Sequence, residues 1–484
     1  MWILKLFLTI IRFLFPIFML KKLFTLKNTN IKILFPFIGI IILSSFLLTI
    51  TKNENDNFLN LLQPNSKARR LIKKYLFPYK FISEQQQELS DLYSTSYTFL
   101  ADIELLDKEN SIEIATHKKT KKLSDYKTID KYKLIYGFYS GINNIFPGSG
   151  YIDFHKDNIV VLSSRGVLAS KKNIEDTEEN FLQIKNNIND FIGINQFKKN
   201  QWFSLKDIFI YGNKIFVSYT EEKNPDCWNT SIIYGDFNYE NINFEKLFSP
   251  DECIHSIQNI DNEFNAHQSG GKIIYFDDNN ILLSLGDYRS RHLAQDIKSV
   301  NGKIIKVNID NGNYEIVSMG HRNPQGLYFD RDNNFILETE HGPQGGDEIN
   351  LIEVHKIREN KMQNYGWAIS SAGEHYGGKN SRNKRKYAKY PLHNSHIEHG
   401  FIEPLYSFVP SIGISEIVKI GKNKYVASSL KDESLYFFEI NENKQITDLD
   451  RVEVFERVRD LIFKENKLYL FMENTASIGV INLN

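Results

Sequence analysis

Cysteine is nearly absent from this chain: Cys227 and Cys253 are the only two among 484 residues. They form no Cys-x-x-Cys pair and no Cys/His cluster, so the usual zinc-site and dithiol redox motifs are excluded. Two such cysteines can form one disulfide in an oxidising compartment or remain buried free thiols. The sequence is compatible with both alternatives.

An excess of charge is also absent, because 59 Lys and Arg residues balance 59 Asp and Glu residues. A nucleic-acid-binding protein usually carries a basic surface, which this balance does not favour. We therefore expect no nucleic-acid partner. Hydrophobic residues form 42% of the chain and aromatic residues 13%, which is enough to build a buried core.

Long apolar runs are concentrated in the first fifty residues. Residues 31–50 contain a single charge, Lys32, and are long enough to cross a bilayer core of about 30 Å. Residues 1–20 form a second apolar segment, either another span or an interfacial helix. No small-residue cleavage motif follows residue 50, so we expect a retained transmembrane helix at residues 1–50 rather than a cleaved signal peptide. The lysines between the segments predict an inner-membrane anchor with the rest of the chain in the periplasm.

The chain beyond the anchor divides into a polar region and a strand-rich region. Residues 51–130 contain helix formers with apolar residues at roughly helical spacing, which predicts a helical or mixed linker. From residue 131 to residue 484, short β-like runs alternate with turns. We therefore expect an all-β domain at residues 131–484.

One phrase recurs in this domain: an apolar strand, a turn containing Asn, and a second apolar strand. Asn suits such turns because tight hairpins often need a positive φ. Recurrent strand pairs at intervals of roughly 40–60 residues favour a β-propeller, with a pair of β-sandwiches as the alternative. The pattern does not fix the number of blades. The phrases are FHKDNIVVLSS, IYGNKIFVSYT, FDDNNILLSLGD, FDRDNNFILETEH, KIGKNKYVASSL and FKENKLYLFME.

The fourth phrase has unusually polar ends. The stretch from Gly320 to Ile352 begins with GHRNPQG and leaves its second strand through EHGPQGGDE. A hairpin returns to the end from which it started, so Arg322 and Asn323 should lie near His341.

Several cations lie near the ends of the phrases. They either pair locally with neighbouring carboxylates, which is the better interpretation without a fold, or converge on a polyanionic small ligand. The cations are Arg322, Lys431, Arg457 and Arg459.

His267 and the Gly342-Pro343 pair are further candidates. His267, in NAHQSGGK, is either a structural residue or a general base beside a ligand, since its ordinary pKa lies near neutrality. Gly342 and Pro343 form either a tight turn or an irregular backbone whose carbonyl oxygens could bind Ca²⁺.

A family resemblance favours the functional interpretations. GHRNPQGL, EHGPQGGDEINLI and NYGWA resemble motifs of the soluble quinoprotein sugar dehydrogenase (glucose/sorbosone dehydrogenase) family, whose members are six-bladed β-propellers that use pyrroloquinoline quinone (PQQ) and Ca²⁺. The supporting matches extend the resemblance over residues 265–463. They are HQSGGKIIYF, LLSLGD, NGKIIKVNID, SSLKDESL and RVRDLIF.

The resemblance implies roles for individual residues. His267 matches the catalytic base that removes the proton of the anomeric hydroxyl. Arg322 and Asn323 match cofactor contacts, and Arg322 also polarises the reactive carbonyl. Three cations match residues that hold the cofactor, and two backbone carbonyls match the Ca²⁺ ligands. These are Lys431, Arg457 and Arg459 for the cofactor, and Gly342 and Pro343 for the ion.

The chain also departs from the family pattern. Ala266 precedes the base where one branch of the family has an acidic residue, Tyr288 lies where the family can contact sugar or cofactor, and YGWA replaces YGWP. The expected function is a membrane-anchored periplasmic quinoprotein that oxidises an aldose to its lactone and passes electrons to an unspecified acceptor. The alternative is an inactive propeller that binds sugars or proteins. A Ca²⁺-dependent lactone hydrolase ranks last, because the matching positions are largely cationic.

Overall fold

The computed structural model describes residues 113–124, 127–134, 149–200 and 202–483, all within one compact unit, Asp91–Asn484. The anchor predicted at residues 1–50 and the linker up to residue 112 lie outside the described residues. Within the described ranges, no helix combines the length and apolar character needed to span a bilayer.

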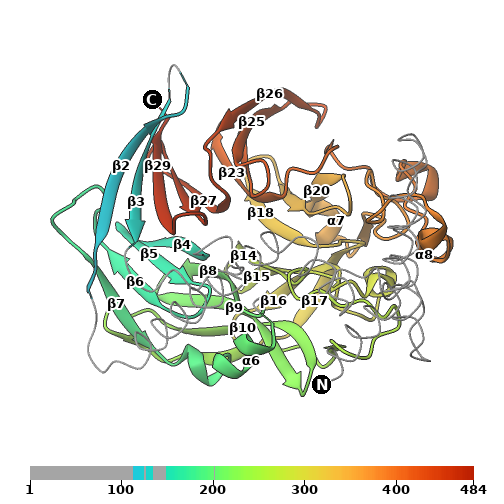
Figure 1. The fold of residues 1–484 in the computed structure, drawn as a ribbon, viewed down its shortest axis with the longest axis horizontal. Coiled ribbons are helices and arrows are strands. Elements are labelled where there is room, and N and C mark those ends of the chain that lie inside the picture. Colours follow the sequence, from blue (N-terminus) through green and yellow to red (C-terminus); the bar gives the residue numbers. More distant parts are fainter. Residues whose placement is uncertain (1–112, 125–126, 135–148, 201, 484) are drawn as a thin grey trace, which may run out of the picture. The chain divides into compact units, whose positions relative to one another are not determined.

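Six mainly antiparallel sheets follow one another along the described chain, with β11 and β21 pairing in parallel (Figure 1). The first has β4 (Gly150–His155), β5 (Asn158–Ser163), β6 (Leu168–Lys171) and β7 (Phe181–Asn186), with β1 (Glu113–Ile114) and β11 (Asn241–Ile242) pairing to β7. The second has β8 (Leu205–Tyr211), β9 (Lys214–Asn224), β10 (Cys227–Asp236), β12 (Glu245–Phe248) and β13 (Ile254–His255). The third has β14 (Gly270–Asp277), β15 (Asn280–Leu285), β16 (Lys303–Asn308), β17 (Tyr314–Met319) and β21 (Gln363–Asn364).

The remaining three sheets complete the set. The fourth has β18 (Pro324–Asp330), β19 (Phe335–Glu340), β20 (Asp347–Glu353) and β22 (Tyr406–Phe408). The fifth has β23 (Ile414–Gly421), β24 (Lys424–Ser429), β25 (Ser434–Ile440) and β26 (Ile446–Glu453). The sixth has β27 (Val458–Lys464), β28 (Lys467–Met472), β29 (Ser477–Asn482), β3 (Thr128–Leu134) and β2 (Thr116–Lys122). Within the described ranges, three short α-helices lie between strands: α6 (Ile194–Lys199), α7 (Val354–Arg358) and α8 (Lys384–Lys389).

The six sheets are the blades of a propeller. Their first strands contact one another in the cyclic order β4, β8, β14, β18, β23, β27 and back to β4. Six hydrophobic clusters fill the six interfaces between neighbouring blades, so each sheet buries both faces. The all-β six-bladed fold expected from the sequence is therefore confirmed.

Every recurring phrase forms the two innermost strands of one blade: β4–β5, β8–β9, β14–β15, β18–β19, β23–β24 and β27–β28. The turn residues Asn334, Asn423 and Asn466 have φ values of 57°, 58° and 59°. Asn tolerates this left-handed conformation better than most residues, which explains why Asn occurs at these turns.

The ring closes because a strand that precedes β4 in the sequence pairs with the last strand of the chain's final hairpins. In the sixth blade, β29 pairs with β3, and β3 pairs with β2 (Figure 1, blue strands beside red ones). The boundary predicted at residue 131 therefore needs correction, because residues 116–122 and 128–130 of the expected linker belong to strands of the last blade. The strand β2 reads THKKTKK and is almost entirely exposed, so it lacks the apolar alternation that identifies a strand.

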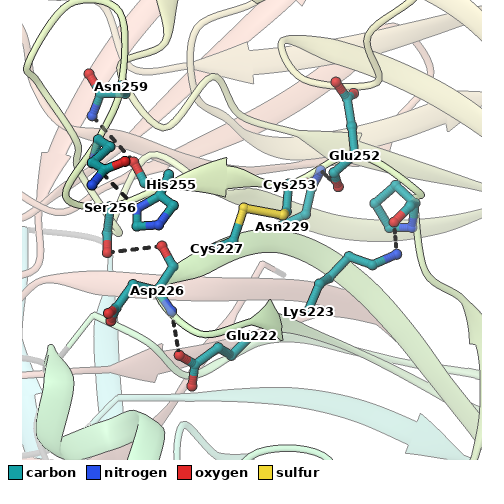
Figure 2. The surroundings of a disulfide bond; sticks show 12 residues. Glu222, Lys223, Asp226, Cys227, Asn229, Glu252, Cys253, His255, Ser256 and Asn259 are labelled. Atoms are coloured by element: carbon teal, nitrogen blue, oxygen red, sulfur yellow. Dashed lines mark hydrogen bonds between the residues drawn. A yellow bond between two sulfur atoms is a disulfide. The ribbon is translucent and has the colours of Figure 1, made fainter.

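Cys227 and Cys253 form a disulfide with a Cα–Cα distance of 5.3 Å (Figure 2). It joins the start of β10 to the segment that leads into β13, and these two strands also pair directly. Beside it, the main-chain N–H of Ser256 donates to the Asp226 carbonyl at 2.7 Å. Of the two alternatives left open by the sequence, the structure contains the disulfide.

Candidate functional site

A cavity of about 370 Å³ lies where the innermost strands converge. Its size is typical of pockets for small organic ligands, which are usually about 300–1,000 Å³. Each innermost strand contributes a lining side chain, in the order Tyr151, Lys206, Lys272, Gln325, Glu416 and Arg459. All six blades therefore contribute side chains to the pocket.

β-Bulges place five of these six side chains. The register between the first and second strands of a blade shifts in β8, β14, β18, β23 and β27. A bulge adds a residue to one strand and turns its side chain away from the regular alternation. The shifted positions contain Lys206, Lys272, Gln325, Glu416 and Arg459.

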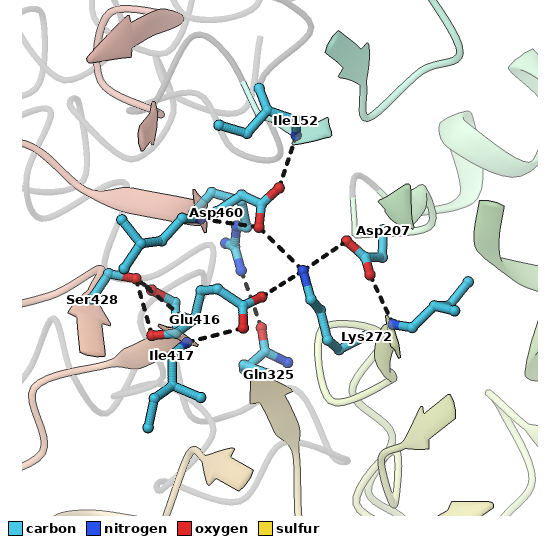
Figure 3. A network of polar contacts seen from close by, with 12 residues as sticks. Ile152, Asp207, Lys272, Gln325, Glu416, Ile417, Ser428 and Asp460 are labelled. Atoms are coloured by element: carbon cyan, nitrogen blue, oxygen red, sulfur yellow. Dashed lines mark hydrogen bonds and ion pairs between the residues drawn. The ribbon is translucent and has the colours of Figure 1, made fainter. Parts of the chain in front are cut away.

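A buried charge network closes part of the cavity wall (Figure 3). Lys272 Nζ lies 2.6 Å from Glu416 and 3.3 Å from both Asp207 and Asp460. Burial would lower the pKa of Lys272, but these carboxylates raise it well above its ordinary value. Burial raises the pKa of Glu416 to about 7, against the effect of Lys272. The central lysine is thus matched by local carboxylates.

Two carboxylates of this network also join neighbouring blades. Asp207 accepts the main-chain N–H of Ile273 at 2.8 Å, and Asp460 accepts that of Ile152 at 2.8 Å. The second bond crosses between the sixth and first blades, where the ring closes. The network therefore fixes the strands that carry the site.

A second group of cations surrounds the same cavity. The Nε atoms of Arg457 and Arg459 donate to Glu473 at 2.8 and 2.7 Å. Burial opposes ionisation of Glu473, yet the two guanidinium groups lower its pKa to about 2. The Lys206 ammonium donates to the Trp202 carbonyl at 2.8 Å, and burial together with Arg459 lowers its pKa to about 7.

The structure brings four of the predicted residues to one cavity. Arg457, Arg459 and the exposed Lys431 line it together with His267. With Lys206 and Lys272 added, five cations line this space together with the carboxylates of Asp207, Glu416 and Asp460, and Glu473 pairs with both Arg457 and Arg459. Arg457 and Arg459 therefore pair locally with Glu473, as the first interpretation expects, and they also converge on one cavity with Lys206 and Lys431, as the second expects.

Arg322 and Asn323 lie beside the cavity, behind His341. The guanidinium Nη1 of Arg322 donates to the His341 carbonyl at 2.6 Å, and its centre lies 5.4 Å from the Trp367 ring. The main-chain N–H of His341 donates to the Asn323 carbonyl at 3.2 Å. The predicted meeting of the two hairpin ends is confirmed.

Gly342 and Pro343 lie in the loop between β19 and β20 and are buried. The Gly342 N–H donates to the Asp347 carboxylate at 3.0 Å, and the Ser411 hydroxyl lies 3.4 Å from the Pro343 carbonyl. A Cβ at residue 342 would lie 1.9 Å from the Gly346 carbonyl oxygen, so only glycine fits without a backbone shift.

His267 packs edge-to-face against Trp202, with ring centroids 5.0 Å apart. Burial, followed by the nearby Arg322 and His341, lowers the pKa of His267 well below its ordinary value. The imidazole is therefore neutral at physiological pH and able to accept a proton. Among the described residues, no carboxylate hydrogen-bonds to this ring.

Ala266 and Tyr288, the two departures near His267, have structural roles. Ala266 is buried in a cluster with Phe203 and Trp228. Tyr288 is fully buried, and its hydroxyl lies 2.8 Å from Thr230 Oγ1. Neither side chain is part of the cavity lining.

A sequence model of the family described as glucose / sorbosone dehydrogenase matches residues 203–479. The chain belongs to this family. The match covers the second to fifth blades and most of β27–β29 of the sixth, including His267 and all the predicted cations.

Curated relatives show the same relationship. The chain is 28% identical over 223 residues to an uncharacterized Synechocystis protein, a match covering 40% of this chain and half of the relative. It is 24% identical to the aldose sugar dehydrogenase of Escherichia coli, over 52% of this chain and 68% of the relative. It is 33% identical to quinoprotein glucose dehydrogenase B of Acinetobacter calcoaceticus, over 21% of this chain and 26% of the relative.

Solved structures share the fold. The soluble aldose sugar dehydrogenase of E. coli in its apo form superposes with a TM-score of 0.54 at 20% identity, covering 69% of this chain and 95% of that one. The PQQ-bound aldose sugar dehydrogenase of Streptomyces coelicolor gives 0.51 at 17% identity, covering 69% and 93%. These likenesses show a shared propeller fold.

Several lining residues of this family member escaped the sequence prediction. Lys206, Lys272, Gln325 and Glu416 occupy bulges, and Trp202 and Tyr376 come from loops. A signal was present: a polar or charged residue precedes the apolar core residues at the start of several innermost strands, as in LKDI, GGKI, ISEI and VRDL. Aligning the hairpins on their turns would have shown it, provided that the residues preceding each quoted phrase were included.

Proposed function

We propose that this chain is a quinoprotein that oxidises an aldose to its lactone, with PQQ held in the central cavity. One observation carries the proposal. A neutral histidine, His267, shares a cavity with Lys206, Lys431, Arg457 and Arg459 on a propeller of the glucose/sorbosone dehydrogenase family. The names of the E. coli and Acinetobacter relatives support the reaction class.

The cavity residues fit this cofactor. PQQ is a flat tricarboxylate, and guanidinium groups bind carboxylates through paired hydrogen bonds. Arg457 and Arg459 are already oriented by Glu473, and Gln325 accepts from Arg459 at 3.1 Å. An anion near Lys206 would restore the charge that burial removes, because an opposite charge favours the protonated amine.

The protein residues would act on the sugar as follows. His267, neutral and partly buried beside Trp202, accepts the proton of the anomeric hydroxyl as the C1–H bond breaks. PQQ, when bound, supplies the hydride acceptor. Arg322 is fixed by the His341 carbonyl and by Glu340, and we assign it cofactor binding and polarisation, with Asn323 as a neighbouring contact. The sugar carbon leaves as a lactone carbonyl, which balances the loss of one proton and one hydride.

We assign Ca²⁺ binding to the backbone carbonyls of Gly342 and Pro343. Oxygen-only donors suit this hard cation. Asp347 fixes the loop by accepting the Gly342 N–H, and it also accepts the Gly413 N–H at 2.6 Å. The same proposal includes a membrane anchor at residues 1–50 and a periplasmic propeller, which the disulfide supports because disulfides persist in oxidising compartments.

The decisive experiment adds PQQ and Ca²⁺ to the purified full-length chain. Cofactor absorbance measures binding, and dye reduction with a panel of aldoses measures turnover. We expect His267→Ala to lower turnover by about 10²–10⁴-fold, the usual contribution of a general base, while PQQ still binds. Arg457→Ala should mainly weaken PQQ binding.

The exposed His117, on the outermost strand β2, provides a matched control. His117→Ala should leave both binding and turnover unchanged. Failure of the wild-type chain to bind PQQ would refute the enzyme proposal, and full turnover by His267→Ala would refute the base assignment.

A non-catalytic binding module is the second candidate. The observation that favours it is the absence, among the described residues, of a carboxylate that orients His267, since Ala266 occupies the preceding position. PQQ or sugar binding without dye reduction for any aldose would support this alternative.

A further inference from the structure

A cluster of buried polar side chains lies in the fourth blade, outside the cavity lining. His321 comes from the segment between β17 and β18, Glu338 and Glu340 from β19, and Asn350 from β20. His321, Glu338 and Asn350 are 0% exposed, and Glu340 is 3% exposed. Such groups are retained in a protein interior when they are hydrogen-bonded, neutralised by protonation, or bound to an ion.

Several atoms of the cluster have no partner. His321 Nδ1, Glu338 Oε1 and Asn350 Oδ1 are buried without a hydrogen bond. The Asn350 amide donates to Glu338 at 3.0 Å and lies 3.4 Å from Glu340. No lysine or arginine in the described part of the chain forms an ion pair with either glutamate. The cluster therefore has donor atoms for a cation and lacks a side-chain cation to satisfy them.

The spacing of the donor atoms suits one ion. His321 Nδ1 lies 3.8 Å from Glu338 Oε2 and 4.0 Å from Glu340 Oε2. Ligands that are each about 2.1 Å from a common metal lie about 3–4.2 Å apart, so these separations match a shared ion.

A second contact orients the imidazole. His321 Nε2 lies 2.8 Å from the Ser318 hydroxyl, and its ring stacks on Tyr365 at 4.9 Å. When the Nε2–H donates to Ser318, the Nδ1 lone pair faces the two glutamates. Metal-binding histidines generally use their other nitrogen in this way.

We propose that His321, Glu338 and Glu340 bind one divalent transition-metal ion of the Mn²⁺ or Zn²⁺ class, with Asn350 Oδ1 as a fourth donor. A mixed imidazole and carboxylate set favours these ions over Ca²⁺, which takes oxygen ligands only. Turning the Asn350 amide would bring its unpartnered oxygen toward the carboxylates in place of its nitrogen.

The metal would also stabilise the cofactor-side loop. Glu340 Oε2 accepts the main-chain N–H of Arg322 at 2.6 Å. An ion held by Glu340 would therefore fix the segment that carries Arg322. The role is structural, and it is independent of whether PQQ binds.

The test uses full-length protein stripped with a chelator, in the absence of PQQ and Ca²⁺. Mn²⁺ is titrated and followed by electron paramagnetic resonance, and Zn²⁺ is measured by elemental analysis after gel filtration. We expect one tightly bound equivalent per chain and a higher thermal unfolding midpoint in the loaded wild-type protein. Glu338→Gln and His321→Gln should each weaken binding at least tenfold.

Asp330→Asn is the matched control, because Asp330 is a buried carboxylate on β18 of the same blade that pairs with Lys419. It should keep one equivalent of metal. Absence of a bound ion in the wild-type protein, or equal affinity in wild type, Glu338→Gln and His321→Gln, would overturn the proposal. Because this assay contains no PQQ, none of these outcomes bears on the dehydrogenase proposal.

Discussion

Lys206 shows how one side chain can make the affinity of the cavity for an anion depend on pH. It extends from a bulge in β8 toward a space shared with Arg459, and burial together with this arginine and Arg165 lowers its pKa to about 7. A bound anion would reverse this effect by stabilising the ammonium form. Below pH 7 the lysine is already charged, whereas above pH 7 it must take up a proton when the anion binds.

We therefore expect PQQ affinity to fall as the pH rises from 7 to 9, by up to about tenfold per pH unit. Lys206→Met should bind PQQ more weakly at pH 7 and show a smaller pH dependence. Absorbance titrations at fixed ionic strength would measure both effects. The matched control is Lys431→Met, which removes an exposed cation of the same cavity and should retain the slope. A wild-type affinity that is constant from pH 7 to 9 would contradict this prediction.

The candidate residues were predictable to different degrees for physical reasons. His267, Arg457 and Arg459 stand in motifs long enough to be specific, and the structure places them at one cavity. Lys272 and Glu416 are charged residues within strands, and regular alternation alone does not place them at the axis. The bulges do so, and a bulge depends on register between strands, which one strand's sequence does not encode.

Among the strands, hairpins were predictable and the ring-closing pair was not. The two innermost strands of each blade are joined by a short turn, so their signal is local. The pairing of β3 with β29 joins distant segments and has no such signal. β3 nevertheless contributes Tyr132, which is 0% exposed in the core between the sixth and first blades.

Tyr132→Ala tests whether β3 is integral to the propeller. We expect a loss of about 3–5 kcal/mol in the free energy of unfolding, the usual cost of removing a large buried aromatic ring. Denaturant unfolding would measure it. Lys119→Ala, at an exposed position of the neighbouring strand β2, should change the value by less than about 0.5 kcal/mol. A small effect for Tyr132→Ala would show that β3 is dispensable.

Across the whole molecule, carboxylates connect three pairs of neighbouring blades; Asp207 and Asp460 are buried, and Asp153 is half-buried. Asp153 on β4 accepts the main-chain N–H of Ile210 on β8 at 2.5 Å, as Asp207 and Asp460 do for their neighbours. Burial raises the pKa of Asp153 to about 7, against the effect of the hydrogen bonds from Phe154 and Ile210. A raised carboxyl pKa means that the folded state holds an extra proton between about pH 4 and pH 7.

The stability that protonation of Asp153 contributes is therefore present at low pH and is lost as the pH rises through 7. Buried histidines such as His321, whose pKa burial lowers to about 3, act in the opposite sense, so the comparison must be between variant and wild type. Relative to wild type, Asp153→Asn should gain stability by on the order of 1 kcal/mol per pH unit between pH 5 and 7. Denaturant unfolding at each pH would measure it. For the exposed Asp157→Asn, the difference from wild type should be constant.

The pairing of β3 with β29 also sets an order of events during synthesis. Lys133 pairs with Ser477, so the ribosome must make nearly all of the propeller before the sixth blade can be completed. Until then the β2–β3 hairpin presents an unpaired edge, and the first blade lacks its neighbour on one side. The entropic cost of closing so long a loop grows only with the logarithm of its length. Ring closure therefore comes late in synthesis, although its entropic cost is small. The pairing of β29 with β3 is the step that completes the sixth blade.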